Sequence, residues 1–234
     1  MFMNNINVVA FDADDTLWIN EPIFQEVTAE FCNMFPTYNE PDIICKMLEE
    51  TQSRTIPIMG YGSKPFVIAM IETAIQITGG HDCAKEINRI IEIGKEMQSH
   101  PVELLDGVED VLDKLAADFK LMLITKGDLM EQERKIQRSG LADYFSCIEI
   151  VSEKDERTYK KCLDFHDICK DEFVMVGNSV KSDVLPVVNI GSNAVHIPFH
   201  TTWCHECVDE SALRGKDYIT MEHAKELIPA LLAQ

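Results

Sequence analysis

Short runs of apolar residues recur along the chain, and each run is followed by polar residues. The first run, INVVAF at 6–11, is continuous and is typical of a strand that is covered on both faces. Similar runs lie at 119–125, 147–151, 173–177 and 193–198. Their length suits strands better than helices. The pattern therefore predicts five buried strands.

Helical patterns separate the later runs. Segment 107–117 has apolar residues at helical spacing, and segments 128–140 and 182–191 end at or next to a glycine stop. Pro186 lies early enough in the last segment to be tolerated in a helix. Strands that alternate with helices indicate a parallel sheet with helices on both faces. We expect an α/β fold with a doubly wound parallel sheet.

Residues 20–100 break this alternation. They contain four helical patterns in succession, at 22–35, 40–50, 64–78 and 83–97, separated by turn signals at Pro36, GYGSKP and GGHD. An insertion of about eighty residues is far longer than a usual loop. We therefore predict an α/β core formed by 1–17 and 101–234, with a helical domain at 18–100. An insertion after the first strand lies above the carboxyl ends of the strands, where ligands bind in such sheets.

The charge of the chain restricts its partners. The 234 residues include 46% hydrophobic residues, which suffice for a packed core, and the formal net charge is -19. A strongly negative protein repels a phosphate backbone and an anionic lipid surface, so neither nucleic acid nor a membrane is the expected partner. A small anionic substrate remains compatible, because local cations can dominate a pocket. No feature predicts the oligomeric state.

Eight cysteines are scattered through the sequence, without the spacing of a disulfide framework. The first residues do not resemble a secretory signal, and no stretch near 18 residues is uniformly apolar. We therefore expect a soluble cytoplasmic protein with reduced thiols.

The first strand ends in a crowded group of acids, Asp12, Asp14 and Asp15. Side chains two positions apart in extended backbone point the same way, so Asp12 and Asp14 should face one point. Carboxylates this close repel one another and resist losing water. Such crowding is tolerated where a cation binds or where the carboxylates perform chemistry. For Asp15 we expect a turn or capping role.

Polar residues also follow the later strands: Thr125, Lys126 and Asp128 after the second, Ser152, Glu153 and Lys154 after the third, and Asn178, Ser179 and Asp183 after the fourth. In a parallel sheet these ends converge along one edge. The predicted site therefore contains several carboxylates, a hydroxyl group and one or two lysines.

Four motifs occur in order at these strand ends: DADDT, LITKGD, a lysine after the third strand, and GNSVKSD. Together they resemble the haloacid dehalogenase-like hydrolase superfamily, in the form that carries a helical cap after the first motif. The resemblance covers nearly the whole chain.

The resemblance implies a role for each matching residue. Asp12 would attack phosphorus to form an aspartyl-phosphate, and Asp14 would act as acid and then base. Mg²⁺ would be the cofactor, held by the Asp12 carboxylate, the Asp14 backbone carbonyl and Asp183. Asn178 replaces an Asp that is frequent in the family, and it can still bind a metal-bound water. Thr125 would bind a phosphate oxygen.

The sequence offers four candidates for the lysine that would contact the phosphate. The second motif often continues with Asn, whereas Lys126 follows Thr125 here, so Lys126 is a candidate phosphate ligand. Lys160 and Lys161 are further candidates, but the TYKKCL segment should be helical. Lys154 is preferred because it lies just beyond a strand end, where it would stabilise the transferring group.

These residues favour a phosphatase that acts on a small phosphorylated metabolite. An alkoxide leaving group benefits from an acid, which Asp14 supplies, whereas a halide leaves without protonation. A haloacid dehalogenase in the same fold is the alternative enzyme. A non-enzymatic phospho-receiver-type module is the third reading, although such modules lack an insertion of this size.

Two further segments invite interpretation. HTTWCHECVDE at 200–210 contains two His and two Cys, but a lone Cys-x-x-Cys is a weak zinc signal, and a structured surface loop is expected instead. GYGSKPF at 60–66 could recognise the leaving group or form a plain turn between helices.

Overall fold

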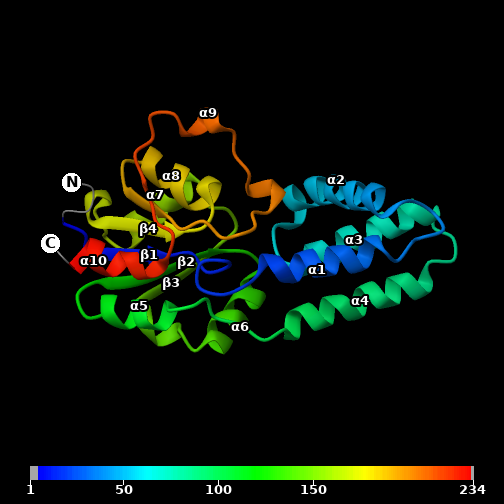
Figure 1. Cartoon of the computed structure of the whole chain (residues 1–234), viewed down its shortest axis with the longest axis horizontal. Helices are drawn as coiled ribbons and strands as arrows, with labels where there is room; N and C mark the ends of the chain where they lie inside the picture. Colours follow the sequence, from blue (N-terminus) through cyan, green and yellow to red (C-terminus); the bar gives the residue numbers. More distant parts are fainter. Residues whose placement is uncertain (1–4, 233–234) are drawn as a thin grey trace. The chain divides into compact units, whose positions relative to one another are not determined.

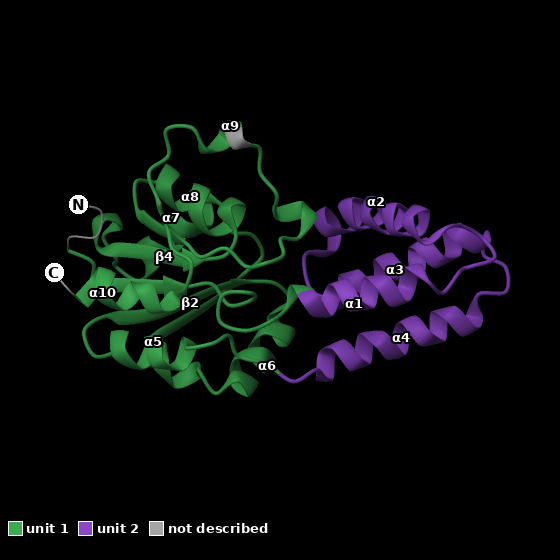
Figure 2. Ribbon diagram, in the orientation of Figure 1, with its two compact units in different colours: residues 1–21, 102–234 green, residues 22–101 purple. Residues whose placement is uncertain are grey.

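The structure is a computed structural model that describes residues 5–232 (Figure 1). The chain divides into two compact units, one comprising 1–21 and 102–234 and the other 22–101 (Figure 2). Within the described range, no helix is both long enough and apolar enough to cross a membrane.

The first unit is built on a six-stranded sheet in the order β3-β2-β1-β4-β5-β6, and all neighbouring strands run parallel. The strands are β1 (Val8–Phe11), β2 (Lys120–Lys126), β3 (Cys147–Val151), β4 (Phe173–Gly177), β5 (Asn193–His196) and β6 (Ile219–Thr220). The five predicted strands are confirmed, and the doubly wound parallel sheet with them. The two-residue β6 was not predicted, because it is too short to carry a periodic signal.

Helices and short turns connect the strands. The helices are α5 (Val108–Leu115), α6 (Leu129–Ser139), α7 (Glu156–Phe165), α8 (Leu185–Asn189), α9 (Glu210–Leu213) and α10 (Leu227–Leu232). The turns are η1 (Ala142–Tyr144), η2 (Lys170–Glu172), the π-helical η3 (Val180–Val184), η4 (Cys204–Glu206) and η5 (Ala224–Glu226). The single helix expected at 182–191 is thus replaced by η3 followed by α8.

The sheet is buried on both faces, as the continuous apolar runs predict. In β1, Val9 and Phe11 pack into the core that includes α5 and α10, whereas Val8 and Ala10 pack into the core that includes α7 and α8. Figure 1 shows these helices on opposite sides of the sheet. Burying both faces leaves the carboxyl ends of the strands as the place where polar side chains gather.

The second unit contains four helices, α1 (Glu21–Cys32), α2 (Pro41–Met59), α3 (Ser63–Thr78) and α4 (Ala84–Ser99). Their buried side chains form one apolar cluster: Phe31, Cys32, Phe35, Ile44, Leu48, Phe66, Ala69, Met70, Ala74, Ile90 and Ile93. Helix α2 extends well beyond the pattern seen at 40–50, and includes Pro57 in its last turn. Gly60 and Gly62 of the GYGSKPF segment lie in the connection between α2 and α3.

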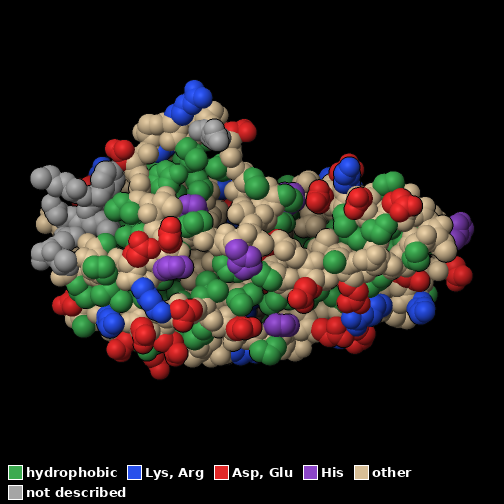
Figure 3. All heavy atoms as spheres, in the orientation of Figure 1, with side chains coloured by type: hydrophobic (Ala, Val, Ile, Leu, Met, Phe, Trp, Pro, Cys, Tyr) green, Lys and Arg blue, Asp and Glu red, His purple; other side chains and the backbone are tan. Residues whose placement is uncertain are grey.

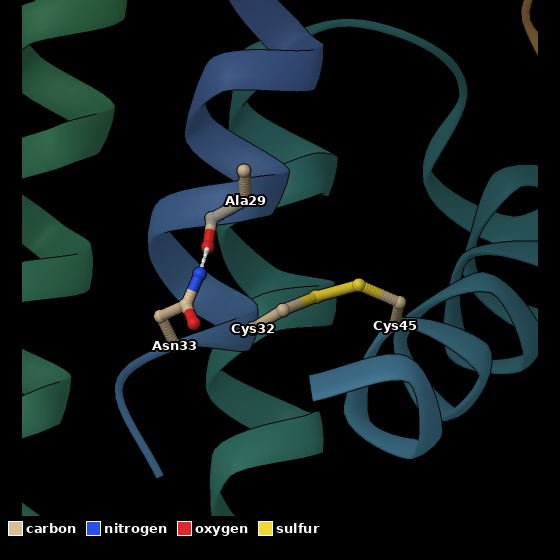
Figure 4. The surroundings of a disulfide bond; sticks show 4 residues. All are labelled: Ala29, Cys32, Asn33 and Cys45. Carbon is tan, nitrogen blue, oxygen red and sulfur yellow. Dashed lines mark hydrogen bonds between the residues drawn. A yellow bond between two sulfur atoms is a disulfide. The ribbon is translucent and has the colours of Figure 1, made fainter. Parts of the chain in front are cut away.

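A disulfide joins Cys32 at the end of α1 to Cys45 in α2 (Figure 4). The two Cα atoms lie 5.6 Å apart, within the usual range for a disulfide. The expectation of reduced thiols is therefore wrong for this pair. The 13-residue separation gave no signal, because the packing of two helices decides whether two distant cysteines meet. The cysteines at 83, 147, 162, 169, 204 and 207 are thiols.

Candidate active site

Asp12 lies at the carboxyl edge of the sheet, just past β1. Its N–H donates to the Val176 carbonyl at 2.8 Å, which continues the pairing of β1 with β4. Thr16 Oγ1 lies 3.0 Å from Asp12 Oδ2 and 3.2 Å from Asn178 Oδ1, and accepts the Asn178 N–H at 3.1 Å. Thr16 therefore ties the loop after β1 to the loop after β4.

Lys154 is buried between two carboxylates. Its Nζ donates to Asp12 Oδ1 at 2.5 Å and to Asp183 Oδ1 at 2.6 Å. Burial disfavours the ammonium, but the two carboxylates outweigh it and raise the pKa of Lys154 above its usual range. Burial also raises the pKa of Asp12 to about 7, and Lys154 opposes this rise. A single lysine is thus the shared cationic partner of two buried acids.

The GNSVKSD segment brings Asp183 back beneath the end of β4. Asp183 Oδ2 accepts the Ser179 N–H at 3.0 Å, so both of its carboxylate oxygens are hydrogen-bonded. A Cβ atom at Gly177 would lie 2.2 Å from Asp183 Oδ2, so only glycine leaves room for this approach. The glycine of the fourth motif is explained by this packing.

Asp14 has a different set of partners from Asp12. Its Oδ1 accepts from Trp18 Nε1 at 2.7 Å and from Lys135 Nζ at 2.6 Å, and its Oδ2 accepts from Gln132 Nε2 at 3.0 Å. Lys135 and Gln132 lie three residues apart on α6 and so share one face of that helix. Asp12 and Asp14 are therefore held by separate cations.

Gln132 connects Asp14 to the end of β2. Its Nε2 also donates to Thr125 Oγ1 at 2.7 Å and to the Lys126 carbonyl at 3.2 Å. The Asp128 side chain caps α6 by accepting the Glu131 N–H at 3.0 Å, which begins the helix directly after the strand. Gln132 and Lys135 were not identified from the sequence; their spacing on a helix that begins at a strand end was the available signal.

Lys126 pairs with a carboxylate from a distant part of the chain. Its Nζ donates to Glu206 Oε1 at 2.6 Å and to Ser182 Oγ at 3.1 Å. Glu206 Oε2 in turn accepts the hydroxyls of Ser179 and Ser182. Burial raises the pKa of Glu206, but Lys126 and the hydroxyls outweigh it, so that pKa lies below its usual range. Glu206 was not predicted, since no local pattern marks it.

Asp15 has the capping role expected from the sequence. It adopts a left-handed conformation, with φ of 61°, and its carboxylate accepts the N–H groups of Asn20 and Glu21 at 2.9–3.0 Å. Burial raises the pKa of Asp15 to about 7. Both carboxylate oxygens serve the backbone at the start of α1.

The structure separates the four candidate lysines. Lys154 contacts Asp12, Lys126 contacts Ser182, and Lys160 and Lys161 lie on α7, as the TYKKCL pattern predicts. Among the residues from 5 to 232, no three His, Cys, Asp or Glu side chains are grouped as a metal site.

The oxygen atoms at the edge suit a hard cation. Asp12 supplies a carboxylate and Asn178 an amide oxygen, and Mg²⁺ prefers such oxygen donors. Thr16 Oγ1 contacts both Asp12 and Asn178, so these two oxygens lie on either side of one hydroxyl. Three carboxylates, at 12, 14 and 183, face two ammonium groups, at 135 and 154. This donor set fits Mg²⁺.

The sequence of this chain resembles those of known hydrolases. Residues 6–191 match the family model of the haloacid dehalogenase-like hydrolases. The N-acylneuraminate-9-phosphatase of Mus musculus is 26% identical over 211 residues, which is 83% of each chain. The pyrimidine 5'-nucleotidase YjjG of Escherichia coli is 29% identical over 93 residues, covering 37% of this chain and 41% of its own.

Solved structures show the same fold. A haloacid dehalogenase-like family hydrolase from Xanthomonas campestris aligns with a TM-score of 0.86 and 38% identity over 98% of this chain and 91% of its own. The putative hydrolase YfnB of Bacillus subtilis, described as bound to magnesium, aligns with a TM-score of 0.64 and 15% identity over 97% of this chain and 99% of its own. At that identity the second match carries the fold alone.

Proposed function

The chain belongs to the haloacid dehalogenase-like hydrolase family, and from this premise we propose that it is a phosphatase that hydrolyses small phosphomonoesters. The observation that carries the proposal is the pair of aspartates at the end of β1. Asp12 is paired with Lys154, and Asp14 is held separately by α6. Two carboxylates with different partners suit two different roles. The phosphatase names of relatives that match most of the chain support the same reaction.

In the proposed reaction Asp12 attacks phosphorus. A bond forms between its carboxylate oxygen and phosphorus as the bond from phosphorus to the leaving oxygen breaks, and Asp14 gives that oxygen a proton. Asp14 then takes a proton from a water molecule, which attacks the aspartyl-phosphate and releases phosphate and free Asp12. Lys154 and Thr125 are the proposed phosphate ligands, together with Lys126. Positive charge near the transferring group stabilises the transition state.

The residues proposed to hold Mg²⁺ are Asp12, the Asp14 carbonyl and Asn178, with Asp183 as the fourth candidate. When bound, the ion would neutralise negative charge on the phosphate and on Asp12. Asp183 already accepts from Lys154 and from the Ser179 N–H, which makes it the residue that orients the lysine. Asn178, next to Asp12 through Thr16, is then the preferred distal oxygen donor.

The helical unit at 22–101 is the proposed cap. Caps open for substrate and close to exclude water, and the hinges would lie near 18–21 and 100–106. The GYGSKPF segment, which links α2 to α3 and includes the first turn of α3, is the proposed substrate-recognising part. No described residue identifies the substrate.

Phosphate release by the purified chain tests the proposal. With Mg²⁺, p-nitrophenyl phosphate and a panel of phosphorylated metabolites should be hydrolysed, the panel including N-acylneuraminate 9-phosphate and pyrimidine nucleoside 5'-monophosphates. Asp12→Asn should lower kcat by about 10³-fold or more, and Asp14→Asn by roughly 10² to 10⁴-fold with metal binding retained. Halide release from a haloacid without metal would instead identify a dehalogenase. Stable phosphorylation without turnover would identify a receiver-type module.

A further inference from the structure

Glu206 is a carboxylate of the candidate site that the proposed reaction leaves without a role. It lies in η4, 80 positions beyond Lys126, and its side chain is 13% exposed. One of its oxygens accepts from Lys126 Nζ at 2.6 Å, and the other accepts the hydroxyls of Ser179 and Ser182. Both oxygens are therefore engaged, and the carboxylate joins the end of β2 to η3.

The position of Glu206 is set by η3 and not by Lys126 alone. The Ser182 hydroxyl donates to Glu206 Oε2 at 2.6 Å. Lys181 Nζ, also from η3, donates to the backbone carbonyl of His205 at 2.6 Å. Side-chain and backbone contacts thus hold η4 against η3. Glu206 is a fixed acceptor, whereas a lysine carries its ammonium group on a flexible four-carbon stem.

The two lysines at the edge contact neighbouring positions of η3. Lys154 donates to Asp183 at 2.6 Å, and Lys126 donates to Ser182 at 3.1 Å. Asp183 is the residue that orients Lys154, and Glu206 makes the corresponding contact with Lys126. Each of these proposed phosphate ligands therefore has a largely buried carboxylate partner outside the DADDT motif.

Charge balance alone does not require Glu206. Asp and Glu number 40 against 21 Lys and Arg, and acidic side chains recur over the visible face (Figure 3). Glu153 already lies 3.5 Å from Lys126 Nζ, with its side chain 49% exposed. Because a buried ion pair contributes little net stability, a second and largely buried carboxylate needs another explanation. The buried pair supplies a defined position for the ammonium group.

We propose that Glu206 is a positioning residue, which holds Lys126 so that its ammonium group can bind the phosphate of the substrate; this inference rests on the proposed function. An ammonium group has three donors. Glu206 and Ser182 accept at 2.6 and 3.1 Å, and the longest of the three contacts, to Glu153 at 3.5 Å, is the one that a phosphate oxygen can replace. A lysine that is fixed in advance loses less freedom when substrate binds, so it stabilises the transferring group more effectively.

A double-mutant cycle on phosphate release tests this role. Lys126→Met should lower kcat/KM for p-nitrophenyl phosphate by about 10²-fold, and Glu206→Ala should lower it by about tenfold. Because Glu206 acts through Lys126, the double variant should be no less active than Lys126→Met. Glu206→Gln keeps an acceptor oxygen within reach of Lys126 and should retain more activity than Glu206→Ala. Glu109→Gln, at an exposed acid on α5, is the control and should match wild type.

The outcomes separate this inference from the proposed function. Circular dichroism of each variant confirms that it is folded, and Glu206→Gln replaces Glu206→Ala in the cycle if the alanine variant is not. Additive losses in the double variant would overturn the inference and leave the phosphatase proposal standing. A lower KM in Glu206→Ala would also overturn it, because Glu206 would then only repel the phosphate. If wild type hydrolyses no phosphate ester, the proposed function fails and this inference fails with it.

Discussion

The carboxyl edge of the sheet and the interior of the helical unit differ in how their buried polar groups find partners. In the helical unit, the buried Thr51, Thr55, Thr73 and Thr78 hydroxyls each donate to the carbonyl four residues earlier in the same helix. At the edge, Asp12 meets Lys154 across 142 positions of sequence. Because each hydroxyl finds its partner in its own helix, these polar groups are buried without any charged partner. The carboxylates and the ammonium group at the edge are charged, and their partners come from distant parts of the sequence. Only the tertiary structure brings such partners together.

As a consequence, the stability of the edge depends on individual residues. Lys154 balances two buried carboxylates, so its loss leaves both uncompensated. The helical unit depends instead on an apolar cluster in which many residues share the stabilisation. Three variants and the reduction of a disulfide test this contrast, beginning with the largest expected effect.

Lys154→Met should reduce the free energy of unfolding of the first unit by roughly 3–5 kcal/mol, because an unpaired buried charge costs that much. Urea denaturation of the variant and wild type measures the loss. Lys161→Met, at an exposed lysine, is the control and should change stability by less than about 0.5 kcal/mol. A loss below 1 kcal/mol for Lys154→Met would mean that the carboxylates do not need the lysine.

Leu48→Ala should destabilise the helical unit by about 3 kcal/mol, since Leu48 is fully buried in its cluster and leaves a cavity. Hydrogen exchange of the α2 and α3 amides reports on this unit separately. Ile58→Ala serves as the control, because Ile58 is 81% exposed. Unchanged exchange in Leu48→Ala would show that the cluster does not hold these helices.

Reduction of the Cys32–Cys45 disulfide should lower the stability of the helical unit by about 2–3 kcal/mol. Without the cross-link, the unfolded chain regains the conformational entropy that loop closure removes. Thermal unfolding with and without dithiothreitol measures the difference. The double variant Cys32→Ser, Cys45→Ser should not respond to the reductant. An identical response by both proteins would place the effect elsewhere in the chain.

Lys135→Met should have the smallest effect, a decrease in kcat of roughly ten- to a hundredfold. Lys135 holds the Asp14 carboxylate, so the decrease should be greater for alkyl phosphates, whose leaving groups need a proton, than for p-nitrophenyl phosphate. Lys135→Arg should retain more of the activity. An equal decrease for both substrates would contradict a role in positioning the acid.

Much of the architecture was predictable because its signals are local. The runs at 147–151 and 173–177 became β3 and β4 with unchanged bounds. Helix α2 was underestimated, since the apolar pattern weakens after Glu50 and Pro57 argues for an end, whereas burial of Thr51 and Thr55 continues the helix. The π-helical η3 was not predicted, because its conformation depends on hydrogen bonds between Ser179 and Asp183 and between Ser179 and Ser182.

The residues of the candidate site also fall into those that a local sequence pattern reveals and those that it does not. Asp12, Thr125, Lys154 and Asp183 could be identified because each lies at or beyond the end of a strand, and the ends of parallel strands share an edge. Gln132, Lys135 and Glu206 could not, because they contact the edge from a helix face and from a turn 80 residues beyond Lys126. The disulfide belongs with them, since it depends on how α1 packs on α2.

The order of apolar runs and acids along this chain was enough to determine a parallel α/β core, a helical insertion and the aspartates at the end of the first strand. Hydrophobic periodicity and strand-end placement operate over a few residues, so one sequence carries them. The folded structure alone decided which lysine pairs with which carboxylate and which serines donate to Glu206. Those pairings depend on distances between residues far apart in the chain, and only tertiary packing determines such distances.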